Sequence, residues 1–410
     1  MRILMITTGY LPYTFSENLC NGKLGYALQR FGWEMDVISR SDEGPTYSAE
    51  WVEPWTAIRD GVHEIKYRVG NKLIKGFDTL WSSFKLGVHP EAGIRWARRA
   101  YELALKLCRE RHYDAILTRS PTDISHLVGL RLKQKLNIKW IANWNDPASP
   151  IWPEPYKHHF SSREQERRMR HTKMCLEGAD VNTFPSQSLL DHFTKHFSFL
   201  SSSRTAVIPH IALMEEIMPE APHTAQTDKF RLCHSGNLSK ERNPELTFKA
   251  LRELIDEGVD KIEFAIMGKI NDYTSELINK YRLEEYVKCI GSFPYMEALQ
   301  KMMEFDCLVL LEAKLEKGIF FASKFTDYAQ IGKPILAISP VDGFAADTIS
   351  KYGGGICIDN EDATSIKQGI AELYSAWQNG TLASNYSTAT LYNQFKAERV
   401  GDIYQNLLGQ

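Results

Sequence analysis

Several features that would classify this protein immediately are scarce or absent in its sequence. None of its apolar runs approaches the length of a membrane span. The seven cysteines are scattered, and no two stand at the spacing of a redox or metal-binding motif. The formal net charge is only −2, which gives no general affinity for polyanions such as nucleic acids. We therefore expect a soluble globular protein of the reducing cytoplasm that does not bind nucleic acid.

Several ligand-binding motifs are also missing. The loop after the first apolar run lacks the G-x-G-x-x-G dinucleotide fingerprint, and no Walker A sequence occurs, which disfavours a nicotinamide enzyme or a nucleotide hydrolase. No Asp-x-Asp pair is present to hold a metal ion against phosphates. Residues 1–8 are apolar, but no small-residue cleavage site of a signal peptide follows them. Protein cations would therefore have to neutralise any bound phosphate, without a metal or another cofactor.

The chain does contain a repeated alternation of apolar strands and amphipathic helices. Strands are predicted at residues 3–8, 35–39, 114–118 and 139–142, with helices and short joints between them. After a proline-containing stretch at 213–229 the pattern restarts, with strands at 230–234, 262–267, 287–290, 307–311, 334–338 and 355–358. This alternation predicts an α/β protein with two Rossmann-like domains that face each other across a cleft. We place the N-terminal domain at 1–212, the linker at 213–229, the C-terminal domain at 230–388, and a final helix at 389–410 that returns to the N-terminal domain.

The stretch 316–340 combines a loop, a short helix, a glycine stop and a buried strand. Ser323 is predicted to cap the helix, and Gly332 to end it. Lys324 falls in the first helical turn, where a cation is unfavourable beside the positive end of the helix dipole. A bound anion would explain this cation, because a phosphate there would meet both the helix N–H groups and the ammonium group. Asp327, three residues later, could accept hydrogen bonds from two neighbouring hydroxyls of a ribose or sugar. Alternatively, Asp327 only stabilises the helix and Lys324 is solvated.

A second group of candidate residues follows strands of the N-terminal domain, at the edge where open parallel sheets bind ligands. Asn143 and Asp146 come directly after the strand at 139–142 and could contact the hydroxyls of a substrate, although Asp before Pro is also common in turns. His126 lies near the start of the helix after the strand at 114–118. A lone histidine is also common as a hydrogen-bonded structural residue.

Residues 64–111 carry eleven Lys or Arg against five Asp or Glu, and aromatic residues are interspersed among them. Such a segment can bind an anionic membrane surface through its charges and its apolar rings. The alternative is an amphipathic cover over the edge of the sheet with its charges in water. These aromatic residues include Tyr67, Phe77, Trp81, Phe84 and Trp96.

Four segments, taken together and in order, resemble the GT-B glycosyltransferases, most closely family 4 of the retaining enzymes that build bacterial polysaccharides. They are EGADVNTFPSQ (177–187), VIPHI (207–211), HSGNLSKERNPELTFKAL (234–251) and FFASKFTDYAQIGKPILA (320–337). The resemblance extends over essentially the whole chain. It implies that the C-terminal domain binds a nucleotide sugar and the N-terminal domain binds the acceptor.

The resemblance also implies roles for single residues. Arg242 matches the basic residue that faces the donor diphosphate, Asp327 matches the acidic residue that takes the ribose hydroxyls, and Lys324 falls in a Ser-Lys element found in part of the family. We expect Arg242 and Lys324 to be catalytic. The chain departs from the common pattern, since Asn237 replaces a basic residue, Ala322 replaces a proline, and Glu316 precedes Asp327 by eleven positions instead of eight. The donor-binding set predicted by the resemblance is Gly236, Asn237, Arg242, Glu316, Ser323, Lys324 and Asp327.

These observations predict transfer of a sugar from a nucleotide sugar to a hydroxyl of a glycan or lipid-linked glycan, with retention of configuration. The enzyme would be cytoplasmic or peripheral on the inner face of the membrane. Two alternatives remain open. One is a nucleotide-sugar epimerase or hydrolase of the same architecture, and the other is a non-catalytic protein that only binds nucleotide sugars.

Overall fold

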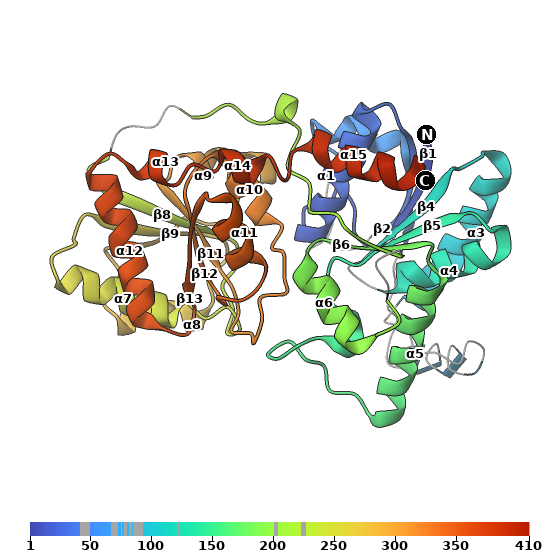
Figure 1. Cartoon of the computed structure of the whole chain (residues 1–410), viewed down its shortest axis with the longest axis horizontal. Coiled ribbons are helices and arrows are strands. Elements are labelled where there is room, and N and C mark those ends of the chain that lie inside the picture. The colour runs from blue at the N-terminus through green and yellow to red at the C-terminus, as the bar shows by residue number, and fades with distance from the viewer. Residues whose placement is uncertain are drawn as a thin grey trace. The chain divides into compact units, whose positions relative to one another are not determined.

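The computed structural model describes residues 1–41, 50–66, 73–74, 76–77, 80–81, 84, 93–120, 123–200, 204–222 and 227–409. The chain divides into two compact units, which are described separately (Figure 1). Unit 1 comprises residues 1–153, 157–211 and 397–410, and unit 2 comprises residues 154–156 and 212–396. The last helix of the chain therefore belongs to unit 1.

Unit 1 is built on a seven-stranded sheet with the order β3-β2-β1-β4-β5-β6-β7. Every strand pairs in parallel with its neighbours, because each crossover passes through a helix or a long connection. The strands are β1 (Arg2–Thr7), β2 (Glu34–Ser41), β3 (Val62–Lys66), β4 (Ala115–Arg119), β5 (Lys139–Asn143), β6 (Val181–Phe184) and β7 (Thr205–Val207).

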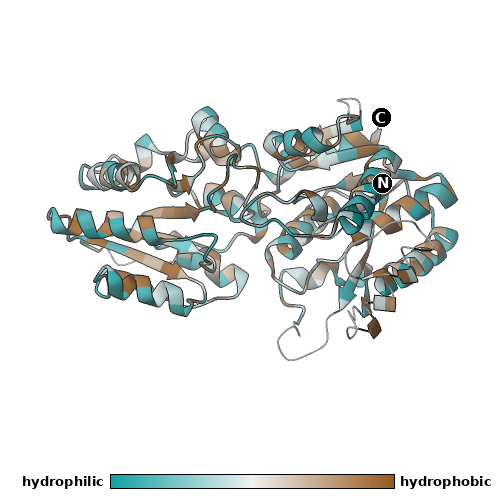
Figure 2. Cartoon of the chain, turned by 90° about the horizontal axis from the view of Figure 1, so that it is seen from below, coloured by the Kyte–Doolittle hydropathy of each residue, from teal (hydrophilic) through white to brown (hydrophobic). Residues whose placement is uncertain are grey.

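The helices of unit 1 lie against this sheet and bury their apolar residues on it (Figures 1 and 2). They are α1 (Ser16–Arg30), α3 (Ile94–Glu110), α4 (Ile124–Leu136), α5 (Ser162–Gly178), α6 (Gln187–His196) and α15 (Ala397–Gly409), with short 3-10 turns at Trp55–Gly61 and Ser149–Ile151. The helix α15 is tied to the sheet, since Arg119 donates to the Tyr404 hydroxyl at 2.9 Å and Lys139 donates to the Leu407 carbonyl at 2.9 Å.

Unit 2 has a six-stranded sheet with the order β10-β9-β8-β11-β12-β13, and its strands also pair in parallel. Its strands are almost continuous apolar runs because helices cover both faces of the sheet (Figure 2). The strands are β8 (Phe230–Ser235), β9 (Ile262–Met267), β10 (Val287–Cys289), β11 (Cys307–Leu311), β12 (Ile335–Ser339) and β13 (Gly355–Asp359).

The helices of unit 2 include α10, which begins at Lys324 and ends where Gly332 adopts a left-handed conformation with φ of 84°. That glycine stop and the strand after it are those predicted from the sequence. The helices are α7 (Glu245–Asp256), α8 (Asp272–Lys280), α9 (Tyr295–Met303), α10 (Lys324–Ile331), α11 (Phe344–Tyr352), α12 (Ala363–Gln378), α13 (Leu382–Asn385) and α14 (Ala389–Tyr392), with a 3-10 turn at Glu215–Ile217.

These two parallel sheets confirm the predicted α/β class with two Rossmann-like halves. Three strands that the sequence pattern did not indicate, β3, β6 and β7, extend the sheet of unit 1 at its two sides. Each of these strands is only 3–5 residues long and mixes polar with apolar residues. A search for runs of apolar residues therefore does not detect them. Among the described residues, none of the helices has the length and apolar content needed to cross a membrane.

Candidate functional site

Lys324 lies at the centre of a charged group in unit 2. Its side chain reaches from the first residue of α10 to the end of β8, where its ammonium group donates to the Ser235 carbonyl. Burial, followed by the nearby Arg242 guanidinium, lowers the pKa of Lys324 to about 8. Lys324 is therefore a cation held at an energetic cost, which an anionic ligand would offset.

Gly236 is required beside this lysine. Its φ is +133°, a conformation that favours glycine, and a Cβ built on it would stand 2.5 Å from the Lys324 ammonium nitrogen. Any larger residue would displace the lysine. Gly236, one of the predicted donor-side residues, therefore lies beside Lys324, and its role in donor binding stays a prediction.

Arg242 and Glu312 form the second part of the charged group. The guanidinium of Arg242 is 3.9 Å from the Glu312 carboxylate, which is only 7% exposed. Burial raises the pKa of Glu312, while Arg242 and Lys324 act in the opposite direction. Tyr156 also hydrogen-bonds with Arg242, and its ring meets Phe320 edge-on with the ring centroids 5.7 Å apart. The two cations thus lie near one buried carboxylate, which cannot neutralise both of them by itself.

Asp327 is buried on α10, and one of its oxygens accepts a hydrogen bond from the Tyr295 hydroxyl at 2.8 Å. Tyr295 is the first residue of α9, so this bond fixes the carboxylate between two helices. The Asp327 carboxylate contributes to the electrostatic environment of Lys324. The predicted pair of Lys324 and Asp327 is therefore close in space as well as in sequence.

Other predicted donor-side residues lie near this group or in loops beside it. Ser323 does not cap α10 with its side chain, because its backbone is already helical. Instead, the Ala322 and Ser323 carbonyls accept from the N–H groups of Phe325 and Thr326, so the predicted hydroxyl cap is wrong. Asn237 accepts from the Lys269 N–H at 2.8 Å, and Glu316 is exposed in the loop after β11. The contact of Glu316 with a donor sugar stays a prediction.

His234 at the end of β8 is a polar residue that no sequence motif distinguishes by itself. Its Nδ1 donates to the Val309 carbonyl at 3.0 Å, which leaves Nε2 as an acceptor. Burial, and after it the Lys324 ammonium, holds the pKa of His234 well below its usual range. His234 is therefore a neutral side chain beneath the charged group.

In unit 1, two of the three predicted acceptor-side residues, His126 and Asn143, are buried. His126 is fully buried, with Nδ1 2.8 Å from the Thr118 hydroxyl and its ring centroid 4.0 Å from that of Trp144, at an interplanar angle of 40°. Asn143 is also buried, and its amide donates to the Thr183 hydroxyl at 3.0 Å. Among the described residues, His126 Nε2 and Asn143 Oδ1 are nevertheless buried without a hydrogen-bond partner. The acceptor contacts of both residues stay predictions.

Asp146 remains partly exposed, and it lies in a polar group that the sequence did not reveal. Asn145 donates to the Glu17 carboxylate at 2.5 Å, while Arg119 and Asp146 both interact electrostatically with Glu17. Burial and then the Asp146 carboxylate raise the pKa of Glu17 to about 8. These residues come from α1, β4 and the loop after β5, so no local spacing could have connected them.

Comparison with known families identifies the chain. Residues 23–211 match the model described as Glycosyltransferase Family 4, and residues 219–389 match the model described as Glycosyl transferases group 1. The chain is a family 4 glycosyltransferase. This result confirms the predicted family and the GT-B fold, and the enzyme belongs to the glycosyl-transferring class. No curated protein matches the chain.

Solved structures share the fold of this glycosyltransferase at low sequence identity. HepE of Anabaena, solved in complex with UDP, has a TM-score of 0.69 at 15% identity, with 100% of both chains covered. Sucrose-phosphate synthase of Thermosynechococcus elongatus has the same TM-score, identity and coverage. WaaG, a glycosyltransferase involved in lipopolysaccharide biosynthesis, has a TM-score of 0.66 at 11% identity, with 99% of each chain covered. At these identities the likeness establishes the fold.

Proposed function

We propose that this glycosyltransferase transfers a hexose from a nucleotide sugar to a hydroxyl of a glycan or lipid-linked glycan, with retention of configuration. The observation that carries the proposal is the charged group of unit 2, where Lys324 and Arg242 share the Glu312 carboxylate beside the buried Asp327. Two fixed cations suit a diphosphate, and the Asp327 carboxylate suits the paired hydroxyls of a ribose.

In the proposed reaction, the bond between the anomeric carbon and the diphosphate oxygen breaks and leaves negative charge on the nucleotide. Lys324 and Arg242 stabilise that charge as it develops, and they need no reorganisation because the fold already holds them in place. The acceptor hydroxyl forms the new bond on the same face of the sugar. Its proton passes to the departing phosphate, so the protein supplies no covalent nucleophile.

A uridine diphosphate sugar is the first donor to test. HepE of Anabaena has been solved with UDP and with UDP-glucose, and its fold covers the whole of this chain. The acceptor is proposed more broadly, as a glycan or a lipid-linked glycan, because WaaG acts in lipopolysaccharide biosynthesis and has the same fold.

Calorimetry with UDP-glucose and other nucleotide sugars tests the donor half of the proposal. We expect saturable binding to the unaltered protein and much weaker binding to Lys324→Ala, with Lys288→Ala as a matched control on the exposed face of β10. Product analysis with an acceptor panel then tests transfer. Release of free sugar at the same rate with and without acceptor would instead establish a hydrolase, and absence of any nucleotide-sugar binding would refute the proposal.

We further propose that unit 1 binds the anionic cytoplasmic leaflet when the acceptor is lipid-linked. Five helical residues of the basic segment expose apolar side chains at a spacing that forms one helical face, with Leu73 83% and Phe84 82% exposed. A cavity of about 500 Å³ lies beside this face and is lined by Phe77, Trp81, Ile94, Arg95, Arg98, Arg99 and Glu102. The five exposed residues are Leu73, Phe77, Leu80, Trp81 and Phe84.

Apolar rings beside arginines match a lipid surface, where the rings enter the interface and the cations meet anionic headgroups. One predicted aromatic contact is corrected: Trp96 is buried, and its indole N–H donates to the Ser39 carbonyl at 3.2 Å. Four further residues of the basic segment lie outside the described residues: Tyr67, Lys72, Lys75 and Lys85.

Sedimentation with vesicles that contain anionic lipid tests this surface. Each Lys or Arg near the membrane should contribute about 1 kcal/mol, so binding should weaken strongly with salt. The double variant Phe77→Ser and Trp81→Ser should reduce vesicle binding while donor binding is unchanged. Arg98→Gln should weaken vesicle binding at low salt and make it less dependent on salt. If the unaltered protein does not sediment with anionic vesicles at low salt, the acceptor is soluble and this surface is only a cover for the sheet.

A further inference from the structure

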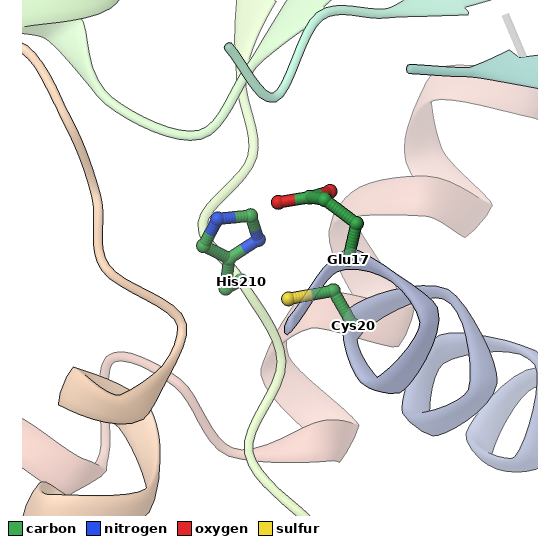
Figure 3. A group of neighbouring side chains, drawn as sticks. All are labelled: Glu17, Cys20 and His210. Atoms are coloured by element: carbon green, nitrogen blue, oxygen red, sulfur yellow. The ribbon is translucent and has the colours of Figure 1, made fainter. Parts of the chain in front are cut away.

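Three side chains with metal-binding atoms converge in unit 1. Glu17 and Cys20 lie three residues apart on α1, so they project from the same side of the helix. His210 comes from the segment after β7. One donor atom from each residue lies within 4.8 Å of the other two, and the side chains point toward one another (Figure 3). The fold thus joins a thiol, an imidazole and a carboxylate that are far apart in the sequence.

This donor set selects the class of metal. A thiolate and an imidazole with one carboxylate suit zinc, whereas calcium and magnesium prefer oxygen ligands throughout. Tetrahedral zinc with its usual bond lengths separates its ligand atoms by roughly 3.3–3.8 Å. The three donor atoms would therefore move together by about 1 Å on binding, which side-chain rotation can supply.

The surroundings support a bound dication. Asn145 donates to one oxygen of Glu17 at 2.5 Å, which orients the carboxylate as an outer partner orients a metal ligand. Asp146 and Arg119 both lie close enough to interact electrostatically with Glu17. When a metal displaces the protons of Cys20 and Glu17, these two groups and Asp146 carry three negative charges against the one positive charge of Arg119, and a divalent cation would cancel the excess.

We propose that Glu17, Cys20 and His210 bind one zinc ion. Three protein ligands leave a fourth position for an oxygen ligand, either water or a hydroxyl. The three ligands belong to unit 1, whereas Lys324 and Arg242 belong to unit 2 and are not part of the proposed metal site. Metal binding can therefore be measured without any sugar donor.

Cobalt substitution gives a direct test on the full chain. We expect one equivalent of Co²⁺ to produce a thiolate-to-cobalt charge-transfer band, and one equivalent of Zn²⁺ to abolish it. Cys20→Ser should eliminate the band and His210→Gln should lower zinc affinity by at least about 100-fold, while Asn145→Ala should lower it by about 10- to 100-fold. The controls are Cys289→Ser and His112→Gln, which replace an exposed cysteine and an exposed histidine.

The unaltered protein alone can overturn the proposal, so the test does not depend on the variants folding. Absence of a charge-transfer band with Co²⁺, or less than about half an equivalent of bound zinc after dialysis, would show that the three side chains do not form a metal site. A band that survives Cys20→Ser but disappears in Cys289→Ser would likewise assign the metal to the exposed thiol. A band lost only with Cys20→Ser and weakened by His210→Gln supports the site.

Discussion

The two units have the same type of sheet but differ in how their functional residues are distributed along the chain. In unit 2 the charged group comes mainly from two connections: Gly236 and Arg242 lie between β8 and α7, and Glu312 and Lys324 lie between the end of β11 and the start of α10. In unit 1 the polar group around Glu17 combines α1, β4 and the loop after β5, and His210 adds a fourth segment. A binding site can thus be local in sequence in one Rossmann-like unit and dispersed in the other.

This difference corresponds to two kinds of ligand. A diphosphate needs closely spaced cations, which one glycine turn and one helix start can supply. A sugar hydroxyl needs only single hydrogen-bonding groups, and many segments can deliver them to one sheet edge. We therefore expect substitutions in unit 2 to affect donor binding and catalysis, and substitutions in unit 1 to affect the acceptor.

The largest effect is expected for the cations of unit 2. Lys324→Ala and Arg242→Ala should each lower kcat/KM by roughly 30- to 1,000-fold, because each removes about 2–4 kcal/mol of stabilisation from the departing diphosphate. Steady-state kinetics with a saturating acceptor measures this loss, and Lys288→Ala should retain full activity. Equal losses from acceptor-side and donor-side variants would contradict the assigned division of roles.

The Asp146 carboxylate in unit 1 should affect the use of the acceptor and leave donor binding unchanged. Asp146→Asn should lower kcat/KM for the acceptor by roughly 10- to 100-fold, because a hydrogen bond to a charged group contributes about 1.5–3 kcal/mol. The donor dissociation constant measured by calorimetry should not change. Asp402→Asn, on the exposed face of α15, is the matched control. A weaker donor affinity in Asp146→Asn would place this residue on the donor side instead.

The pH dependence of donor binding should show whether Lys324 of unit 2 binds the donor. The pKa of Lys324 is about 8 in the ligand-free protein, so raising the pH through 8 removes its charge, and donor affinity should fall by up to about tenfold per pH unit. Lys324→Ala should lose this dependence. Affinity that stays constant from pH 7 to 9.5 would exclude Lys324 as the titrating cation.

The lowered pKa of Lys324 has the opposite consequence for the free energy of unfolding, which increases as the pH rises. The folded-state pKa is below the usual value of 10.5, so unfolding takes up a proton between about pH 8 and 10.5. Lys324 therefore costs stability at pH 7, and that cost is relieved as the pH rises. Lys324→Met should accordingly raise the Tm of the ligand-free protein at pH 7 while donor binding is lost.

The sequence allowed the fold to be predicted because its signals are local. Buried parallel strands appear as continuous apolar runs, and the lysine at the start of α10 conflicts with the helix dipole, which predicts an anion. The burial of two predicted acceptor-side residues could not be foreseen, for a physical reason. Asn143 and His126 lie at the expected edge, but their side chains turn into the core to pair with Thr183 and Thr118. Whether a polar side chain faces a ligand or a neighbouring strand depends on contacts between distant segments.

The smallest effect is expected for Tyr295, whose hydroxyl donates to Asp327 at 2.8 Å. Tyr295→Phe removes this one hydrogen bond and leaves the ring in place, so the carboxylate keeps its charge but loses its fixed orientation. A loss of about 0.5–1.5 kcal/mol corresponds to a donor affinity that is weaker by roughly 2- to 10-fold. Tyr273→Phe on α8 serves as the control. If Asp327 holds the ribose, Tyr295→Phe should weaken binding of UDP but not of inorganic diphosphate. Equal weakening of both ligands would mean that Tyr295 acts on the cations and not through the ribose contact.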